Sequence, residues 1–312
     1  MRFGRTFFLQ QLSLMSKKLL LSLLAVLAFT ACSDDEEKTT SNSNRNPTYE
    51  HNEYGRYEFP RISDPSENLI LIHKTANGEV NYSVEWDIEK KSQRWSCYQM
   101  YKSNMVKEKG LDRYHAGPGE DQYPQDPLLP VQYRWTTDPF DRSPYQHGHI
   151  CPSADRLNSK ESNYQTFYLT NMMPQKGGFN EKVWANMEAK VRNWANQNNY
   201  TFCDTMYVCK GGTIDNKSQI MTTLSNGLIV PKYYYMAILI SKKRSNGTMK
   251  YDAMAFWIEH KESSDNGTAL AKYVITIDEL ESKTGIDFFC NLPDDIERQV
   301  ESTVNMKLWG YN

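Results

Sequence analysis

Two histidines stand one residue apart in the segment Gln146-His147-Gly148-His149. Alternate side chains of a β-strand point to the same side, so both imidazoles would face one ligand or substrate. Such a pair can bind a transition metal, or one imidazole can accept a proton near neutral pH. Gly148 would let the chain pass close to a ligand, because it has no side chain. Two surface histidines would show the same spacing, so the pair needs support from the rest of the sequence.

Four polar residues downstream could act with this pair. Asn171 follows the apolar run 167–170, and Asn180 directly precedes a predicted helix, where an asparagine side chain commonly caps the first turn. Glu188 and Arg192 lie at the edge of the apolar stripe of that helix. Their spacing suits an ordinary ion pair between adjacent turns, but the same positions could border a cleft.

Hydrophobic patterns predict the elements that must position these residues. Apolar side chains recur with a helical period between Glu181 and Gln197, and Asn246-Gly247 is typical of a hairpin turn. Residues 110–147 are rich in glycine, proline and aspartate, and long ordered loops of this kind often carry function. Because strands and helices do not alternate as βαβ units, we expect an α+β fold. The expected strands are residues 82–86, 95–101, 167–170, 206–209, 233–240, 251–258 and 273–277, and two further short helices are expected near 278–283 and 294–304.

The composition limits the classes of function. The chain has 312 residues, of which 39% are hydrophobic, and a formal net charge of −2. This content is enough for a sizeable core and excludes a wholly disordered chain. One apolar run, residues 19–29, approaches spanning length, so a protein with several membrane spans is excluded. The balanced charge excludes a strongly basic coat, so a polyanion would need a local patch or a metal ion.

The first residues have the layout of an export signal. Lys17-Lys18 precede a short apolar run that ends in Thr30-Ala31-Cys32. This end resembles the lipobox of bacterial lipoproteins, which implies that Cys32 is lipidated and anchors an exported protein in the outer membrane or at the cell surface. An ordinary secretory signal with a spare cysteine is the alternative. We therefore expect a lipoprotein signal peptide (1–31), a flexible tether (32–65) and one domain (66–312).

Five cysteines follow Cys32, and an odd number leaves at least one thiol unpaired in an exported chain. No Cys-x-x-Cys pair occurs, which disfavours a structural zinc site. The sequence does not determine which of them pair: Cys97, Cys151, Cys203, Cys209 and Cys290.

Taken together, the polar residues resemble those of the DNA/RNA non-specific endonuclease family, which includes secreted bacterial nucleases and mitochondrial endonuclease G. The resemblance extends more weakly over residues 80–290. It implies a ββα-metal (His-Me finger) nuclease fold, with a central antiparallel sheet flanked by helices. The implied activity is metal-dependent hydrolysis of phosphodiester bonds in DNA and RNA with little sequence specificity. The residues that match in order and spacing are His149, Asn171 with Pro174-Gln175, Asn180, Glu188 and Arg192.

The resemblance also implies a role for each matched residue. A neutral His149 would take a proton from water as the general base. Asn180 would bind one Mg²⁺ through its amide oxygen, since this ion keeps several waters, and Mn²⁺ could substitute. Glu188 would orient a metal-bound water, Asn171 would position the base or those waters, and Arg192 would contact a phosphate of the nucleic acid.

The chain departs from the family at its Asp-Arg-Gly-His box. Gln146 replaces the aspartate, and His147 replaces the arginine that the family uses for phosphate or transition-state contacts. His147 could do part of this work only when protonated, and its unperturbed pKa makes protonation incomplete at neutral pH. Arg156 or Arg192 would then compensate as contacts to the nucleic acid.

Two alternative functions follow from this departure. The first is a catalytically weakened surface lipoprotein that binds nucleic acid on the same fold. The second takes His147 and His149 as transition-metal ligands, completed by His115 or His260. Tight zinc or copper binding lost in His147→Ala would favour the second alternative, whereas weak Mg²⁺ binding lost in Asn180→Ala would favour the nuclease.

Overall fold

The computed structural model describes residues 41–63, 66–263 and 269–311. The chain divides into Met1–Ser41 and a second unit, Asn42–Asn312. The predicted export signal and Cys32 lie outside the described residues. Across the described ranges, no helix is both long enough and apolar enough to cross a membrane.

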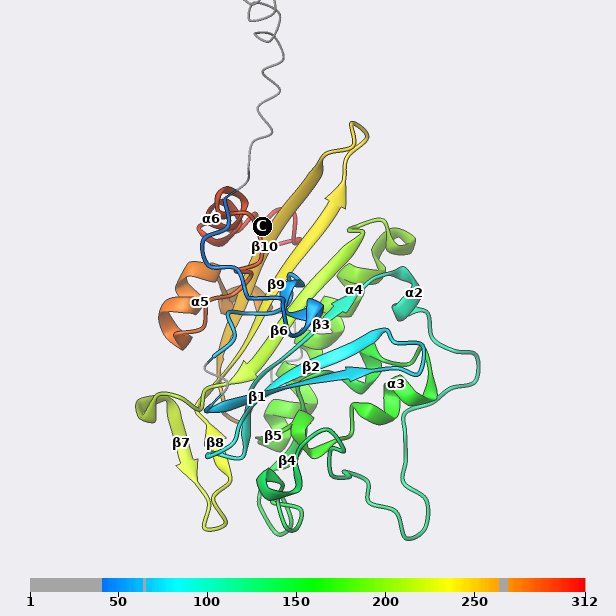
Figure 1. The fold of residues 1–312 in the computed structure, drawn as a ribbon, viewed down its shortest axis with the longest axis vertical. Helices are drawn as coiled ribbons and strands as arrows, with labels where there is room; N and C mark the ends of the chain where they lie inside the picture. Colours follow the sequence, from blue (N-terminus) through cyan, green and yellow to red (C-terminus); the bar gives the residue numbers. More distant parts are fainter. Residues whose placement is uncertain (1–40, 64–65, 264–268, 312) are drawn as a thin grey trace, which may run out of the picture. The chain divides into compact units, whose positions relative to one another are not determined.

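A seven-stranded sheet runs through the second unit (Figure 1). All neighbouring strands in it are antiparallel, which confirms the expected α+β fold with a central antiparallel sheet. The strands in spatial order are β1 (Asn68–Lys74), β2 (Val80–Asp87), β3 (Ser92–Met100), β6 (Thr205–Gly212), β9 (Tyr233–Lys243), β10 (Met249–Glu259) and β11 (Val274–Ile275).

Shorter elements surround this sheet. Two pairs of strands stand apart from it, β4 (Gln146–His149) with β5 (Met172–Gln175) and β7 (Ile220–Thr223) with β8 (Ile229–Pro231). The helices are α2 (Lys102–Met105), α3 (Lys160–Gln165), α4 (Ala185–Tyr200), α5 (Ile277–Thr284) and α6 (Asp294–Glu301). A π-helical segment, η5 (Phe179–Trp184), precedes α4, and 3-10 turns are η1 (Asn52–Gly55), η2 (Val131–Tyr133), η3 (Ser153–Asp155), η4 (Leu169–Asn171), η6 (Lys217–Gln219) and η7 (Leu270–Tyr273).

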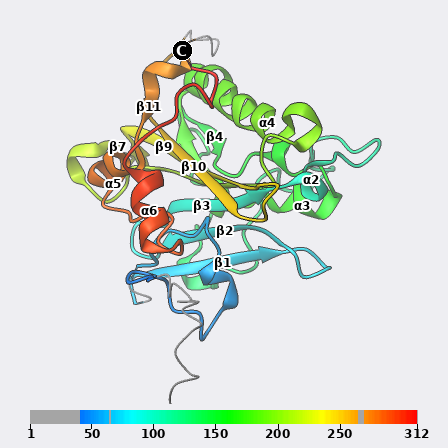
Figure 2. The same cartoon turned by 90° about the horizontal axis from the view of Figure 1, so that it is seen from above.

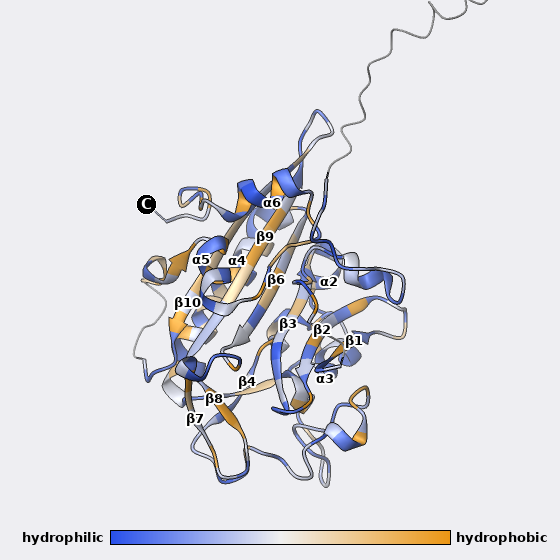
Figure 3. Cartoon of the chain, turned by 60° about the vertical axis from the view of Figure 1, so that its left-hand side comes forward, coloured by the Kyte–Doolittle hydropathy of each residue, from blue (hydrophilic) through white to orange (hydrophobic). Residues whose placement is uncertain are grey.

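Both faces of the sheet are buried. Along β9, Met236 and Ile238 pack in one cluster with Trp194 of α4, whereas Ala237 and Leu239 pack in a second cluster with α5 and α6. Figures 1 and 2 accordingly show α4 on one side of the sheet and α5 with α6 on the other. Figure 3 shows hydrophobic residues along the central strands β9 and β10. Strands covered on both faces produce the continuous apolar runs that the sequence contains.

Most of the predicted elements are confirmed. β2, β6, β9 and β10 contain four of the expected strands, β3 contains the fifth except for its last residue, and α5 contains the helix expected at 278–283. The helix expected at 294–304 begins where expected but ends at Glu301. The strand expected at 273–277 is reduced to β11. The strand expected at 167–170 is wrong, because the N–H groups of Phe167 and Asn171 bond to carbonyls three residues earlier and turn the chain. The sequence pattern also does not predict β1.

Residues 42–63 pack against the domain, which corrects the prediction that they belong to a flexible tether. Phe59 has no exposed surface. Asn46 is 2% exposed, and its side chain donates to the carbonyl of Pro60 at 2.9 Å and accepts from the N–H of Ile62 at 3.0 Å. Polar composition is therefore compatible with order here, because the polar side chains bind backbone groups.

The five cysteines of the domain are buried and carry free thiols. Burial raises the pKa of Cys151 and of Cys203 to about 12. The described part of the chain is therefore held together without a disulfide.

We expect Asn46→Ala to lower the free energy of unfolding by about 2 kcal/mol, because it leaves buried backbone groups of Pro60 and Ile62 without partners. Urea denaturation of the purified chain measures this change. Tyr49→Ala, in the same segment but 84% exposed, is the matched control and should be neutral. Equal stability of the two variants would contradict the ordered packing of this segment.

Candidate active site

A cavity of about 570 Å³ opens between the loop after α2, strand β4 and the start of the long helix. Its lining contains both neutral and charged polar side chains, so it can receive a polar ligand. His147, His149, Asn180 and Glu188, all predicted from the sequence, line this cavity. Asn171, Arg156 and Arg192 do not belong to its lining.

The order of local elements explains why these side chains meet. β4 pairs antiparallel with β5, with His149 opposite Met172, and the chain then enters the helix. The helix begins with the π-helical turn η5, whose N-cap is Gly178. Asn180 lies inside that turn and does not cap the helix, which corrects the capping interpretation. Wide turns of this kind occur frequently at functional sites.

His149 is the buried histidine of the cavity. It is 9% exposed, and its Nε2 has no hydrogen-bond partner among the described residues. Burial lowers the pKa of His149 well below 6.5, and the charge of Arg113 lowers it further, against a hydrogen bond to the backbone of His147. The imidazole is therefore neutral at pH 7, with one ring nitrogen available to accept a proton.

Gly148 serves the packing of two strands rather than the approach of a ligand. A Cβ atom at this position would lie 2.2 Å from the side chain of Gln175 on β5. Gln175 is completely buried, so it has no open space to move into. The glycine therefore lets Gln175 cross β4, which corrects the expectation from sequence.

His147 is held between two aromatic rings. Its ring stacks on Tyr123 and Phe140, with 3.7 and 4.2 Å between ring centres. Its Nε2 lies 2.9 Å from Oδ2 of Asp138. A phosphate would have to displace Asp138 from this nitrogen, so the structure does not support the predicted phosphate contact of His147.

The third ligand of the transition-metal alternative is not found. His115 is exposed and does not line the cavity. His260 accepts the N–H of Lys176 at Nε2 and therefore donates from Nδ1 to the carbonyl of Pro231, at 2.8 and 2.9 Å. Both ring nitrogens of His260 are engaged. In the part of the chain that the structure describes, no group of three potential ligands includes a histidine.

Asn180 can offer an amide oxygen to a cation. Its Nδ2 donates to Oε1 of Gln146 at 2.8 Å, and Nε2 of Gln146 donates to Glu181. The engaged Nδ2 leaves the oxygen of the Asn180 amide as the group free to coordinate. With the carboxylates of Glu181 and Glu188 in the same lining, the donors are oxygens, which Mg²⁺ prefers. The residues present therefore fit a hard divalent cation.

Glu188 does not pair with Arg192, although their spacing would allow it. Its Oε1 lies instead 2.6 Å from Nζ of Lys210, on the central strand β6. The side chain of Lys210 is 1% exposed and lies 4.9 Å from the ring centre of Trp184. Burial raises the pKa of Glu188, while the neighbouring Lys210 opposes this shift.

The two arginines expected to contact nucleic acid bind groups of the protein. Arg156 is 1% exposed, and its guanidinium donates to the carbonyls of Asn81 and Gln99 at 3.0 Å. The prediction that Arg156 contacts phosphate is therefore wrong. Arg192 is partly exposed, but its Nη1 lies 2.7 Å from Oδ1 of the buried Asp155. A phosphate contact of Arg192 would have to compete with this ion pair.

Asn171 is completely buried behind the cavity. Its Oδ1 accepts the N–H of Cys151 at 2.8 Å, and its Nδ2 donates to the carbonyls of Cys151 and Thr166. The side chain thus holds the backbone that follows His149. Asn171 therefore positions the base, which is one of its two predicted roles. The other role, orienting metal-bound waters, is wrong, because both ends of its amide bind the backbone.

Sequence reasoning missed three residues of the site. Arg113 and Tyr123 line the cavity, and Arg113 lies 4.7 Å from the ring centre of Phe167. Both belong to the irregular segment 110–147, whose length indicates function without identifying residues. Lys210 could have been noticed as a lone charge at the end of an apolar strand.

Comparison with known proteins identifies relatives of this chain. The sequence model of the family described as DNA/RNA non-specific endonuclease matches residues 71–295. The mitochondrial nuclease of Saccharomyces cerevisiae is 26% identical over 71% of this chain and 71% of its own length. A nuclease of a Nostoc strain is 28% identical over 72% of this chain and 76% of its own length.

A solved structure shows the same fold. The crystal structure of the EndoG/EndoGI complex superposes with a TM-score of 0.57 at 21% identity, covering 75% of this chain and 90% of the matched chain. This match confirms the expected ββα-metal nuclease fold, in which β4, β5 and the following helix form the ββα unit.

We expect Lys210→Met to lower the free energy of unfolding by about 3 kcal/mol, because it leaves the carboxylate of Glu188 partly buried and unpaired. Adding Glu188→Gln should restore most of this loss, since the remaining charge is removed. Urea denaturation of the single and double variants measures the coupling. The control is Lys182→Met, which changes an exposed lysine of η5, directly before the helix that carries Glu188. Additive effects of the two site substitutions would contradict the ion pair.

Proposed function

Because the chain belongs to the DNA/RNA non-specific endonuclease family, and is thus a hydrolase of phosphodiester bonds, we propose that it is a metal-dependent endonuclease. It cuts DNA and RNA within the strand and with little sequence preference. The observation that carries this proposal is the buried, neutral His149, which lines the same cavity as Asn180 and Glu188 and whose Nε2 has no hydrogen-bond partner among the described residues.

His149 acts as the general base in this proposal. Its Nε2 takes a proton from the attacking water, which is possible because burial keeps the ring neutral at pH 7. Asn171 fixes the backbone of Cys151, two residues after the base, through two hydrogen bonds. The base therefore needs no reorientation when substrate binds.

Asn180 holds the divalent cation through its amide oxygen, and Glu188 orients a water bound to that cation. We propose that the cation is Mg²⁺, with Mn²⁺ as a substitute. When bound, the cation neutralises the phosphate and stabilises the leaving oxygen. Gln146 orients the amide of Asn180 through its hydrogen bond to Nδ2. The glutamine that departs from the family box thus supports the cation ligand, which favours an active enzyme over the catalytically weakened binding protein.

In this proposal, the positively charged side chain of Arg113 faces the phosphate. It is exposed at the cavity, whereas His147, Arg156 and Arg192 are engaged with other groups of the protein. Together with the bound metal, one such arginine explains how a chain of net charge −2 handles a polyanion.

Supercoiled plasmid tests the proposed activity directly. The purified chain should produce nicked and linear DNA with Mg²⁺ and none with EDTA. His149→Ala should slow cleavage by about 10²–10⁴-fold, the range of a lost general base. Asn180→Ala should abolish Mg²⁺-dependent cleavage, while His115→Ala and Asn193→Ala, at exposed positions outside the cavity lining, should retain it.

The pH profile of the same reaction tests the state of His149. Because its pKa lies well below 6.5, the fraction of neutral base is nearly constant from pH 6.5 to 8, and activity should fall only at lower pH. An intact plasmid with Mg²⁺ and Mn²⁺ at pH 6 and 8 would refute catalysis and favour the nucleic-acid-binding alternative, which a gel-shift assay then measures.

We also propose that the chain is exported and anchored in a bacterial outer membrane or at the cell surface through a lipid on Cys32. The support is the lipobox-like end of the predicted signal. Cys32→Ser should move the protein from the membrane fraction to the soluble fraction, with retained nuclease activity. Unchanged membrane association of Cys32→Ser would contradict the anchor.

A further inference from the structure

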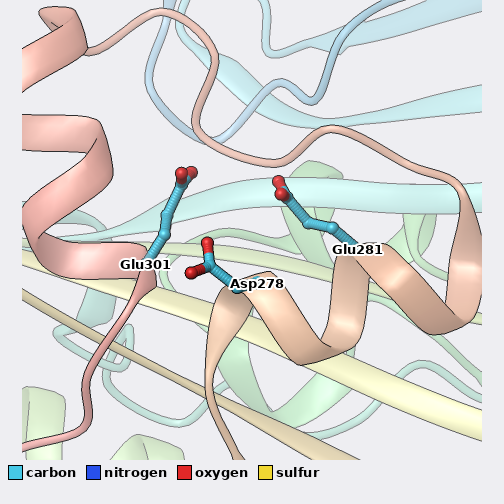
Figure 4. Close-up of side chains that lie close together, drawn as sticks. All are labelled: Asp278, Glu281 and Glu301. Atoms are coloured by element: carbon cyan, nitrogen blue, oxygen red, sulfur yellow. The ribbon is translucent and has the colours of Figure 1, made fainter.

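Three carboxylates converge where α5 and α6 meet, far along the chain from the residues of the cavity. Asp278 and Glu281 lie one turn apart on α5, and Glu301 is the last residue of α6. One oxygen of each can be chosen so that all three lie within 4.8 Å of one another. Figure 4 shows the three side chains turned toward the same region between the helices.

Glu301 distinguishes this cluster from an ordinary acidic surface. It is 7% exposed, and its Oε1 has no hydrogen-bond partner among the residues described. A buried carboxylate oxygen without a donor is costly, so it needs either a proton or a cation. The Glu301 carboxylate lies beside those of Asp278 and Glu281 in Figure 4, so a cation held among the three would supply the missing partner.

The surroundings of the cluster are acidic as well. Burial raises the pKa of Glu301 to about 10 and that of Glu281 to about 7, and the neighbouring carboxylates of Asp287 and Glu297 add to both shifts. The amide of Asn44 donates to Asp287 and Glu297 but carries no charge. Two arginines lie nearby, but their charges lower the pKa of neighbouring carboxyls: Arg61 that of Asp287, and Arg298 that of Glu297.

We propose that Asp278, Glu281 and Glu301 form a second metal site, which binds Ca²⁺. Calcium takes carboxylate oxygens at about 2.3–2.6 Å, so opposite ligands lie about 5 Å apart, whereas opposite Mg²⁺ ligands lie about 4 Å apart. The three carboxylate oxygens lie within 4.8 Å of one another, close enough for one Ca²⁺ to bind them all, and the flexible coordination of this ion tolerates their irregular arrangement. Asp278 is exposed, so the ion has a path from solvent and can keep waters to complete its coordination.

The site would join elements that are distant in sequence. α5 and α6 pack on the face of the sheet opposite to α4, so the site lies away from the cavity. α6 also holds the start of the unit, because Oδ1 of Asp294 accepts the N–H of Ser43. A Ca²⁺ ion between the two helices therefore stabilises the N- and C-terminal parts of the domain together. This inference does not depend on the proposed nuclease activity.

Thermal unfolding at pH 7.5 tests the proposal. We expect 1 mM CaCl₂ to raise the Tm of the chain by about 5 °C over EDTA, as expected for a ligand well above its Kd, and 1 mM MgCl₂ to have a smaller effect. The Ca²⁺ shift should persist in Asn180→Ala, which separates it from the metal of the cavity. Glu301→Gln should abolish the shift, and Glu79→Gln, an exposed control, should keep it.

Two further measurements decide between a cation and a shared proton. Isothermal titration of Asn180→Ala with CaCl₂ should give one site per chain, absent from Asn180→Ala/Glu301→Gln. Asp278→Asn, at an exposed position, should weaken binding at least 10-fold without the folding risk of a buried substitution. The proposal is wrong if Ca²⁺ neither raises the Tm nor gives a heat of binding in the titration. A higher Tm of Glu301→Gln in EDTA would then show that the carboxyls share a proton instead.

Discussion

The ion pair between Glu188 and Lys210 is the constraint on which the site depends. Lys210 lies on the central strand of a sheet that is covered on both faces, so its ammonium group cannot reach water and requires a carboxylate. Glu188 meets this requirement and thereby fixes the rotation of α4 over the sheet. Asn180, about two turns earlier, is placed in the cavity by the same rotation, opposite His149 on β4.

The sequence spacing predicts where the polar residues stand along their elements, but not which group each one binds. His149, Asn180 and Glu188 reach the cavity as expected. Asn171 and Arg156 bind backbone carbonyls instead. Those carbonyls are left unpaired by turns and strand ends, and their positions depend on tertiary structure. A single sequence therefore does not separate a substrate-binding arginine from one that supports the backbone.

The same limit applies to the fold. Strands buried on both faces, such as β9, are predicted because their apolar runs are long. Residues 42–63 lack such a run, and side-chain bonds to remote backbone and side-chain groups hold them in place, as in the 3.1 Å bond from the N–H of Asn46 to Oδ1 of Asn291. Local pattern carries no information about a partner so far along the chain. Arg113 is not predicted for a related reason, since only the assembled cavity shows what it faces.

The buried cysteines have a consequence for where this enzyme can work. Cys97 of β3 and Cys209 of β6 lie opposite each other in the strand register as free thiols, and burial raises the pKa of both well above 9. Thiols in this state are poor nucleophiles and are shielded from oxidants. The described domain thus has neither a cross-link that a reductant could break nor an exposed thiol that an oxidant could modify. Once folded, the domain therefore keeps the same contacts in oxygen-rich and in strictly anaerobic surroundings, because none of the interactions among its described residues depends on a disulfide.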